Sequence, residues 1–220
     1  VDTVNGEEWF VHFQDRGMYG RIVHLQPVNW VDGWPVAGDL FKEGTYEISS
    51  VRRGYALELA VDFVRQELPR SWSWRIDPDE PVVSYPNQTL EEVAATWPEG
   101  EVAVRIGDWM NRPHQRWTIT AVPQAGGYLG GQYYRIGIEG TDRVLAAAEG
   151  AEVVAAAAYT GAPEQLWRIE QLTDGSYRIM PKAVPGCDCA YVLTSVADST
   201  PTLARYNPQS DNCKWKFVRK

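Results

Sequence analysis

Short apolar runs that alternate with polar residues dominate the chain, and turn-forming residues separate them. At the N-terminal end, 8–14 alternates, 15–18 reads as a turn, and 19–26 alternates again. Two alternating runs joined by a short turn predict a β-hairpin. Neighbouring strand residues point to opposite faces. One face of the second strand is therefore expected to carry Arg21, Val23 and Leu25, and the other Ile22, His24 and Gln26.

From about residue 43 onward the same short alternation continues, interrupted by Gly, Pro, Asn and Asp. This pattern predicts many short antiparallel strands and little helix. One or two helical turns are expected within 91–97. The alanine-rich stretches at 146–148 and 155–158 are interpreted as strand, because they occupy strand positions in an internal repeat.

That repeat consists of three units, each with an aromatic residue two positions before an isoleucine, then a leucine, then a tryptophan. Its tyrosines are Tyr46, Tyr134 and Tyr177, its leucines are Leu57, Leu145 and Leu193, and its tryptophans are Trp117, Trp167 and Trp215. The tryptophans are 50 and 48 residues apart, and the first unit is longer because of an insertion at about 62–98. Three such units are expected to close together into a barrel without free sheet edges.

The repeated pattern over about 43–220 resembles the ricin-type β-trefoil lectins. The closing tripeptides carry the resemblance: Gln115-Arg116-Trp117, Gln165-Leu166-Trp167 and Cys213-Lys214-Trp215. It implies an all-β fold, a β-trefoil of three repeats, in which the closing tryptophans pack in the core. It also implies carbohydrate as a partner.

Residues 1–39 resemble the last propeller blade of glycoside hydrolase family 43. The stretches that carry this resemblance are 11–15, 19–27 and 30–35, which read VHFQD, YGRIVHLQP and WVDGWP. That family trims arabinose, xylose or galactose from plant polysaccharides, with carboxylates that lie in earlier blades. The resemblance therefore implies no catalytic residue in this chain, and the remainder of a catalytic propeller as its partner.

Two hairpin residues are candidates for sugar contact. The resemblance assigns Arg21 to the sugar pocket, where fixed guanidinium donors suit hydroxyl groups. His12 lies on the same strand pair and is the second candidate. A surface arginine and a structural histidine are the alternative interpretations.

The trefoil offers a second candidate site, in its first unit. In the lectin family an acid follows the repeat leucine, an aromatic ring forms a platform, and an asparagine precedes the closing glutamine. The corresponding positions after the second and third leucines hold Ala146 and Thr194, which are not acids. The first unit is therefore predicted to bind sugar weakly, in the millimolar range or about 4 kcal/mol. Its candidate residues are Glu58, Trp109, Asn111 and His114. A trefoil kept only for packing is the alternative.

Composition narrows the functional classes. Lys and Arg number 21 against 29 Asp and Glu, so the net charge is −8, which argues against nucleic acid and anionic membrane as partners. No apolar run approaches the roughly 20 residues that span a bilayer. Ten tryptophans and eleven tyrosines suit both sugar stacking and core packing. No metal-ligand spacing occurs, and no cofactor is expected.

The three cysteines leave the disulfide state open. Cys187 and Cys189 are interpreted as too close for an easy bridge to each other, while a bridge from one of them to Cys213, or free thiols, stays possible. The chain begins at Val1 without Met or a signal-type segment, which indicates a processed form or a fragment. A secreted or periplasmic location is expected.

Three functions follow as hypotheses: the C-terminal part of a family-43-like glycosidase with an accessory trefoil, a stand-alone lectin, or a structural interaction module. A complete enzyme is disfavoured, because no nucleophile elbow, phosphate loop or zinc motif occurs. The hairpin favours the first hypothesis, since a blade without neighbours leaves sheet edges open. Trp72 and Trp74 alternate within the insertion, so both indoles are expected on one face of a strand. They could form a sugar platform or a patch that docks on the missing propeller, and the docking patch is favoured.

Overall fold

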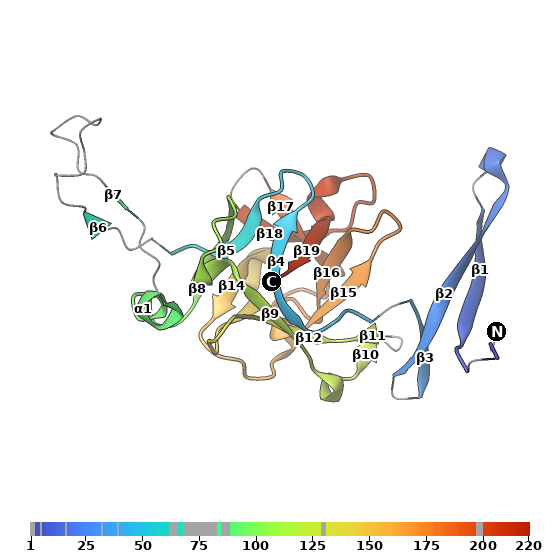
Figure 1. Ribbon diagram of the computed structural model, residues 1–220, viewed down its shortest axis with the longest axis horizontal. Coiled ribbons are helices and arrows are strands. Elements are labelled where there is room, and N and C mark those ends of the chain that lie inside the picture. Colours follow the sequence, from blue (N-terminus) through green and yellow to red (C-terminus); the bar gives the residue numbers. More distant parts are fainter. Residues whose placement is uncertain are drawn as a thin grey trace.

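A three-stranded sheet precedes a larger β-barrel with its cap, and both are visible in the computed structural model (Figure 1). The structure describes residues 3–220, apart from 5, 16, 32, 39, 62–65, 68–82, 85–88, 129–130 and 197–199. Within these residues one α-helix is present, and strands dominate. The expected all-β fold is confirmed.

The N-terminal sheet is antiparallel, in the order β1 (Trp9–Asp15), β2 (Arg21–Val31) and β3 (Trp34–Ala37). A short 3₁₀ turn, η1 (Gly17–Tyr19), joins the first two strands. Arg21 lies opposite Asp15, and His24 lies opposite His12. Because directly opposed residues share a face, this register confirms the two expected faces of the second strand.

Twelve strands form the barrel and cap, four from each repeat unit. The first unit contains β4 (Gly44–Ser50), β5 (Ala56–Leu59), β8 (Val102–Gly107) and β9 (Trp117–Ala121). The second contains β12 (Tyr134–Ile138), β13 (Val144–Ala147), β14 (Val153–Ala156) and β15 (Trp167–Gln171). The third contains β16 (Tyr177–Pro181), β17 (Tyr191–Val196), β18 (Thr200–Arg205) and β19 (Trp215–Arg219).

The first and last strands of each unit close a six-stranded barrel. Going round it, β4 pairs with β9, β9 with β12, β12 with β15, β15 with β16, β16 with β19, and β19 with β4 again. The two middle strands of each unit pair as a hairpin, and the three hairpins together are called the cap. They are β5 with β8, β13 with β14, and β17 with β18. This arrangement is a β-trefoil, as the repeat predicts, and the alanine-rich stretches are strands.

The remaining elements are short. The end of the insertion forms α1 (Leu90–Ala94), where Thr89 and Glu92 make a capping box. Two small strand pairs are β6 (Gln66–Glu67) with β7 (Val83–Ser84), and β10 (Gly127–Tyr128) with β11 (Gly131–Gln132). Short 3₁₀ turns are η3 (Pro113–Gln115), η4 (Pro123–Ala125), η5 (Glu149–Ala151), η6 (Pro163–Gln165) and η7 (Asp211–Cys213). Trp72 and Trp74 lie outside the described residues.

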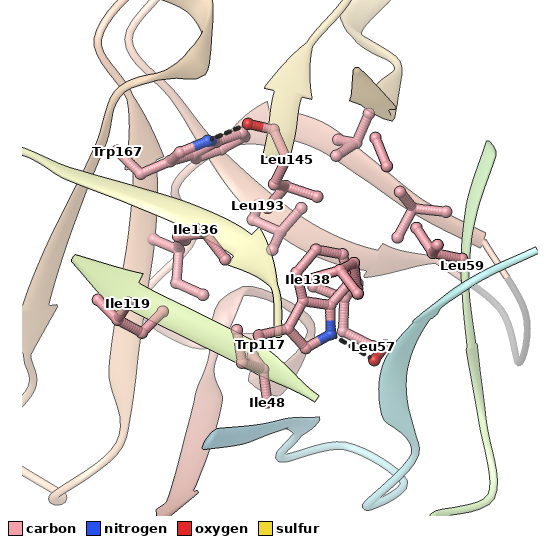
Figure 2. Packing of buried hydrophobic residues seen from close by; sticks show 14 of the residues in the cluster. Ile48, Leu57, Leu59, Trp117, Ile119, Ile136, Ile138, Leu145, Trp167 and Leu193 are labelled. Atoms are coloured by element: carbon pink, nitrogen blue, oxygen red, sulfur yellow. Dashed lines mark hydrogen bonds between the residues drawn. The ribbon is translucent and has the colours of Figure 1, made fainter. Parts of the chain in front are cut away.

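The three closing tryptophans fill the core and are fully buried. Each indole Nε1 donates to the backbone oxygen of the repeat leucine in its own unit, at 2.7 Å from Trp117 to Leu57, and at 2.8 Å in the other two units. Figure 2 shows two of these bonds beside the surrounding isoleucines and leucines. The predicted core role of the tryptophans is confirmed.

Phe41 lies among the repeat tyrosines in the segment that links the N-terminal sheet to the barrel. Its ring centroid is 5.2 Å from that of Tyr46, 6.0 Å from Tyr134, 5.4 Å from Tyr177 and 4.6 Å from Phe217. Tyr134 Oη also donates to the Phe41 carbonyl at 3.1 Å. Because these aromatics come from strands of all three units, Phe41 attaches the linker to the whole barrel.

Cys187 and Cys189 form a disulfide, so the expectation that they are too close was wrong. A turn brings them together, because the Cys187 amide donates to the Val184 carbonyl and Gly186 takes a positive φ. Their Cα atoms are 5.2 Å apart, within the usual range for a disulfide. Cys213 is a buried free thiol beside Thr194.

Candidate functional site

Glu58 of β5 lies opposite Arg105 of β8 in the cap hairpin of the first unit. Its carboxylate is buried and surrounded by donors from the protein itself. Arg105 Nε donates to one oxygen at 2.6 Å, and Gln115 Nε2 donates to the other at 2.6 Å. His114 Nε2 lies 3.6 Å from that second oxygen. A ligand hydroxyl would have to displace these donors, so the geometry favours a structural role for Glu58.

The charge of Glu58 is set by opposing effects. Burial raises the pKa of the Glu58 carboxyl, but the hydrogen bonds from His114, Arg105 and Gln115 together hold that pKa below its usual value. The carboxylate therefore stays ionised within the protein at neutral pH. A buried, ionised and fully engaged acid stabilises the hairpin that carries it.

The other first-unit candidates do not complete a pocket around Glu58. His114 is 2% exposed, while Trp109 lies beside the Lys220 ammonium, whose Nζ is 4.2 Å from the indole. Asn111 has a positive φ, and its Oδ1 accepts from Arg116 at 3.1 Å. Of the four predicted residues, the structure brings Glu58 and His114 together. It engages Trp109 and Asn111 with other partners.

In the lectin family that the repeat resembles, the aromatic platform is expected ten residues before the closing tryptophan, and in the first unit this position holds Gly107. A Cβ at Gly107 would lie 3.0 Å from a carboxylate oxygen of Glu58. An aromatic ring there would therefore collide with the acid in its observed position. In the second and third units the positions opposed like Glu58 and Arg105 hold Ala146 with Val154, and Thr194 with Thr202.

The two hairpin candidates lie on opposite faces of the N-terminal sheet. Arg21 is exposed, 3.8 Å from Asp15, and its guanidinium lies 4.7 Å from the Phe13 ring. His12 stacks on His24 with ring centroids 5.0 Å apart, and its Nε2 lies 3.1 Å from Gln26 Oε1. Arg21 and His12 therefore cannot both line one pocket on a single face.

In the part of the chain that the structure describes, cavities on the outer surface of the barrel include two that bear on function. One, of about 540 Å³, lies where the end of β3 and the linker meet β15 and β16. There Glu170 forms ion pairs with Arg168 and Arg178. The other, of about 510 Å³, lies over β9 and β12 and is lined by Tyr159, Asp142 and Arg135. The sequence did not indicate this second cavity, because its residues come from three separate segments with no shared period.

Two structural features bear on metal binding and on membrane insertion. Among the described residues, no group of three or more His, Cys, Asp or Glu side chains is placed to hold a metal ion. Within the same residues, no helix has the length and apolar character needed to cross a membrane.

The family comparison agrees with the topology. Residues 113–202 match the family model described as ricin-type beta-trefoil lectin domain-like. The barrel with its cap is a lectin-like β-trefoil. The match begins at the 3₁₀ turn before Trp117 and runs through the second unit into the third.

One curated relative is similar over part of the chain. A protein of Xylanibacter ruminicola named as a β-xylosidase is 39% identical over 87 residues, which cover 36% of this chain and 16% of that protein. The chain thus spans a small part of the length of this relative.

Solved structures share the fold. A mosquitocidal holotoxin has a TM-score of 0.55 at 14% identity, covering 84% of this chain and 18% of that chain. The designed three-fold symmetric protein ThreeFoil has a TM-score of 0.51 at 19% identity, covering 80% and 99%. A Polyporus squamosus lectin has a TM-score of 0.51 at 15% identity, covering 82% and 50%. Such low identities show the β-trefoil fold alone.

Proposed function

We propose that this chain is the C-terminal part of a glycosidase resembling family 43, and that its trefoil binds carbohydrate of the plant polysaccharide on which the enzyme acts. The observation that carries the proposal is the combination of a lectin-like trefoil with a partial likeness to a protein named as a β-xylosidase. The enzyme would act on arabinose, xylose or galactose linkages in that polysaccharide. Fold alone does not define function, so the N-terminal sheet supplies the second support.

Both faces of the N-terminal sheet are apolar and exposed. Phe13, Val23 and Leu25 on one face are 57%, 69% and 60% exposed, and Phe10 and Ile22 on the other are 48% and 43% exposed. An antiparallel sheet at a protein surface normally keeps one polar face. A propeller blade packs against a neighbour on each side, and this pattern fits such a blade. The remainder of the propeller, with its catalytic carboxylates, is therefore the proposed partner.

The competing function is a structural module that binds no sugar. The buried network around Glu58 favours it, because the acid expected to meet a sugar is engaged by the protein's own donors. A stand-alone lectin is less well supported, because it would leave both apolar faces of the N-terminal sheet uncovered.

A secreted or periplasmic location belongs to the same proposal. A polysaccharide substrate lies outside the cell, and the Cys187–Cys189 disulfide fits an oxidising compartment.

Two measurements test the proposed function. Mass spectrometry of the native protein should give a species much larger than 24.8 kDa, and that species should hydrolyse an aryl xyloside, arabinoside or galactoside. The 220-residue chain alone should show no turnover, because the catalytic carboxylates lie elsewhere. Turnover by the isolated chain, or a native species of 24.8 kDa, would overturn the glycosidase assignment.

A further inference from the structure

The cavity over β9 and β12 has the size and position of a small-ligand cleft. Its volume of about 510 Å³ falls within the usual range of roughly 300–1,000 Å³ for such sites. The first unit supplies β9, and the second supplies β12, the following loop and the segment before η6. We propose that this cavity, rather than the Glu58 position, binds the carbohydrate. The proposal rests on the proposed function and names its site.

The floor of the cavity is the outer face of two paired strands. Thr120 lies opposite Arg135, and Thr118 lies opposite Gly137, while Ile119 and Ile136 between them point into the core. Small residues on this face leave room that long side chains would fill. At Gly137 a larger residue is disfavoured, since a Cβ there would lie 3.1 Å from the Arg143 carbonyl oxygen.

The equivalent junction of the second and third units carries charged side chains that pair with one another. On β15 and β16 the corresponding positions hold Arg168 opposite Met180 and Glu170 opposite Arg178, and both arginines form ion pairs with the glutamate. Those charges already satisfy one another. At the junction of β9 and β12, threonines stand in place of Arg168 and Glu170, and a glycine stands in place of Met180. The remaining arginine, Arg135, lies over the Tyr159 ring.

Tyr159 gives the cavity an aromatic wall. Its side chain is half-buried, and the Arg135 guanidinium lies 5.5 Å from its ring centroid. A pyranose or furanose ring presents a face of C–H groups that packs against such a ring. The neighbouring guanidinium supplies fixed donors for hydroxyl oxygens.

Asp142 gives the cavity an acceptor. It is exposed on the loop between β12 and β13, and within the described part of the chain no hydrogen bond or ion pair engages its carboxylate. A carboxylate accepts hydrogen bonds from two adjacent sugar hydroxyls, and charge-assisted bonds are the stronger ones. Acceptor, donor and aromatic surface thus surround one cavity.

The rim that carries Asp142 is fixed in place by the end of the insertion. Arg143 Nη1 donates to the Gly100 carbonyl at 2.7 Å, and its Nη2 donates to the Pro98 carbonyl. Gly140 has a φ of +70°, and a Cβ there would collide with the Leu90 side chain of α1. A rim held before the ligand arrives lowers the ordering cost of binding.

The site differs from the position at which the repeat places an acid. In the second unit the residue after the repeat leucine is Ala146, which cannot accept a hydrogen bond through its side chain. The proposed ligand is therefore held by Asp142 and Tyr159, which lie three residues before and fourteen residues after Leu145. Its class is a short neutral oligosaccharide of xylose, arabinose or galactose.

Isothermal titration calorimetry of the full 220-residue chain with xylotetraose, arabinotetraose and galactotetraose tests this site. The parent chain should bind one of them with a millimolar Kd. Tyr159→Ala should weaken binding at least tenfold, and Asp142→Asn should weaken it three- to tenfold. Tyr159→Phe keeps the ring and should stay within twofold of the parent.

Matched controls distinguish this site from others. The Arg178 guanidinium lies 5.0 Å from the centroid of the Tyr206 ring, an arrangement like that of Arg135 and Tyr159. Because Tyr206 does not line the cavity over β9 and β12, Tyr206→Ala should leave Kd unchanged. Asp188→Asn controls for the loss of an exposed acid. If Tyr159→Ala and Asp142→Asn bind like the parent while Trp109→Ala does not, the cavity is the wrong site and carbohydrate binding stands. If the parent binds none of the three sugars, both proposals fail.

Discussion

Glu58 is a buried acid whose charge depends on three neighbours in the first unit. Its pKa is lowered in the folded protein, so the folded state holds the carboxylate ionised to lower pH than the unfolded chain does. The resulting stabilisation is fully present above the ordinary carboxyl pKa of 4.5. It is lost as the pH falls from there through the lower pKa of the folded state.

Glu58→Gln should therefore destabilise the protein in a pH-dependent way. At pH 7 the loss should be about 2 kcal/mol, because Arg105 would be left without its carboxylate. Urea unfolding followed by fluorescence between pH 7 and pH 3 measures the difference between parent and variant, and this difference should shrink below pH 4.5. Glu99→Gln, which changes an exposed acid, is the control. A difference that stays constant over the whole range would contradict the role assigned to Glu58.

At the scale of the element, one tryptophan serves each unit in the same way. Its indole is buried, and its N–H satisfies the backbone oxygen of the repeat leucine. An unpaired carbonyl in a core costs free energy comparable to a lost hydrogen bond. The tryptophan thus stabilises each unit both by filling core volume and by donating a buried hydrogen bond.

Trp167→Phe tests this element. It removes the donor to Leu145 and leaves a void, so the free energy of unfolding should fall by about 2–4 kcal/mol. Trp30→Phe is the matched control, because Trp30 is 59% exposed, and it should change stability by less than about 0.5 kcal/mol. Equal effects of the two variants in urea unfolding would show that burial of the repeat indole is not what matters.

The elements that repeat were predictable from sequence, whereas the cavity was not. Trp117, Trp167 and Trp215 are regularly spaced, and a regular spacing records a regular structure. The sugar site of the first unit stays a prediction, and the sequence did not reveal that Arg105 lies directly across from Glu58, because this pairing depends on strand register. The cavity over β9 and β12 depends on register too, since it needs Thr118 opposite Gly137.

At the scale of the whole molecule, Phe41 attaches the linker that follows the N-terminal sheet to the barrel. Burial raises the pKa of Tyr134 to about 12. The neutral hydroxyl therefore keeps its donor role up to strongly alkaline pH. The linker is thus held by an aromatic contact and a stable hydrogen bond.

Phe41→Ala should detach the linker from the barrel. The loss of packing against four aromatic rings should lower the free energy of unfolding by about 2–3 kcal/mol. Limited proteolysis should then cut near 38–43 faster than in the parent. Leu25→Ala changes an exposed apolar residue of the N-terminal sheet and should leave both measurements unchanged. Unchanged cleavage in Phe41→Ala would show that the linker is held by other contacts.

The exposed faces of the N-terminal sheet allow a test of the proposal that this chain belongs to a larger propeller enzyme. Phe13 and Val23 are paired across β1 and β2 and share an exposed apolar face. Without a covering neighbour, such a face should promote self-association of the 220-residue chain. Sedimentation velocity should show association that increases with concentration, and the double variant Phe13→Lys, Val23→Glu should remain monomeric. Val218→Lys, on the exposed surface of β19, should associate like the parent. In the longer protein that we propose, the same double variant should lower stability, because the face would there be buried against the next blade. A chain that stays monomeric at all concentrations, together with a longer protein unaffected by the double variant, would remove the support that this sheet gives to a propeller.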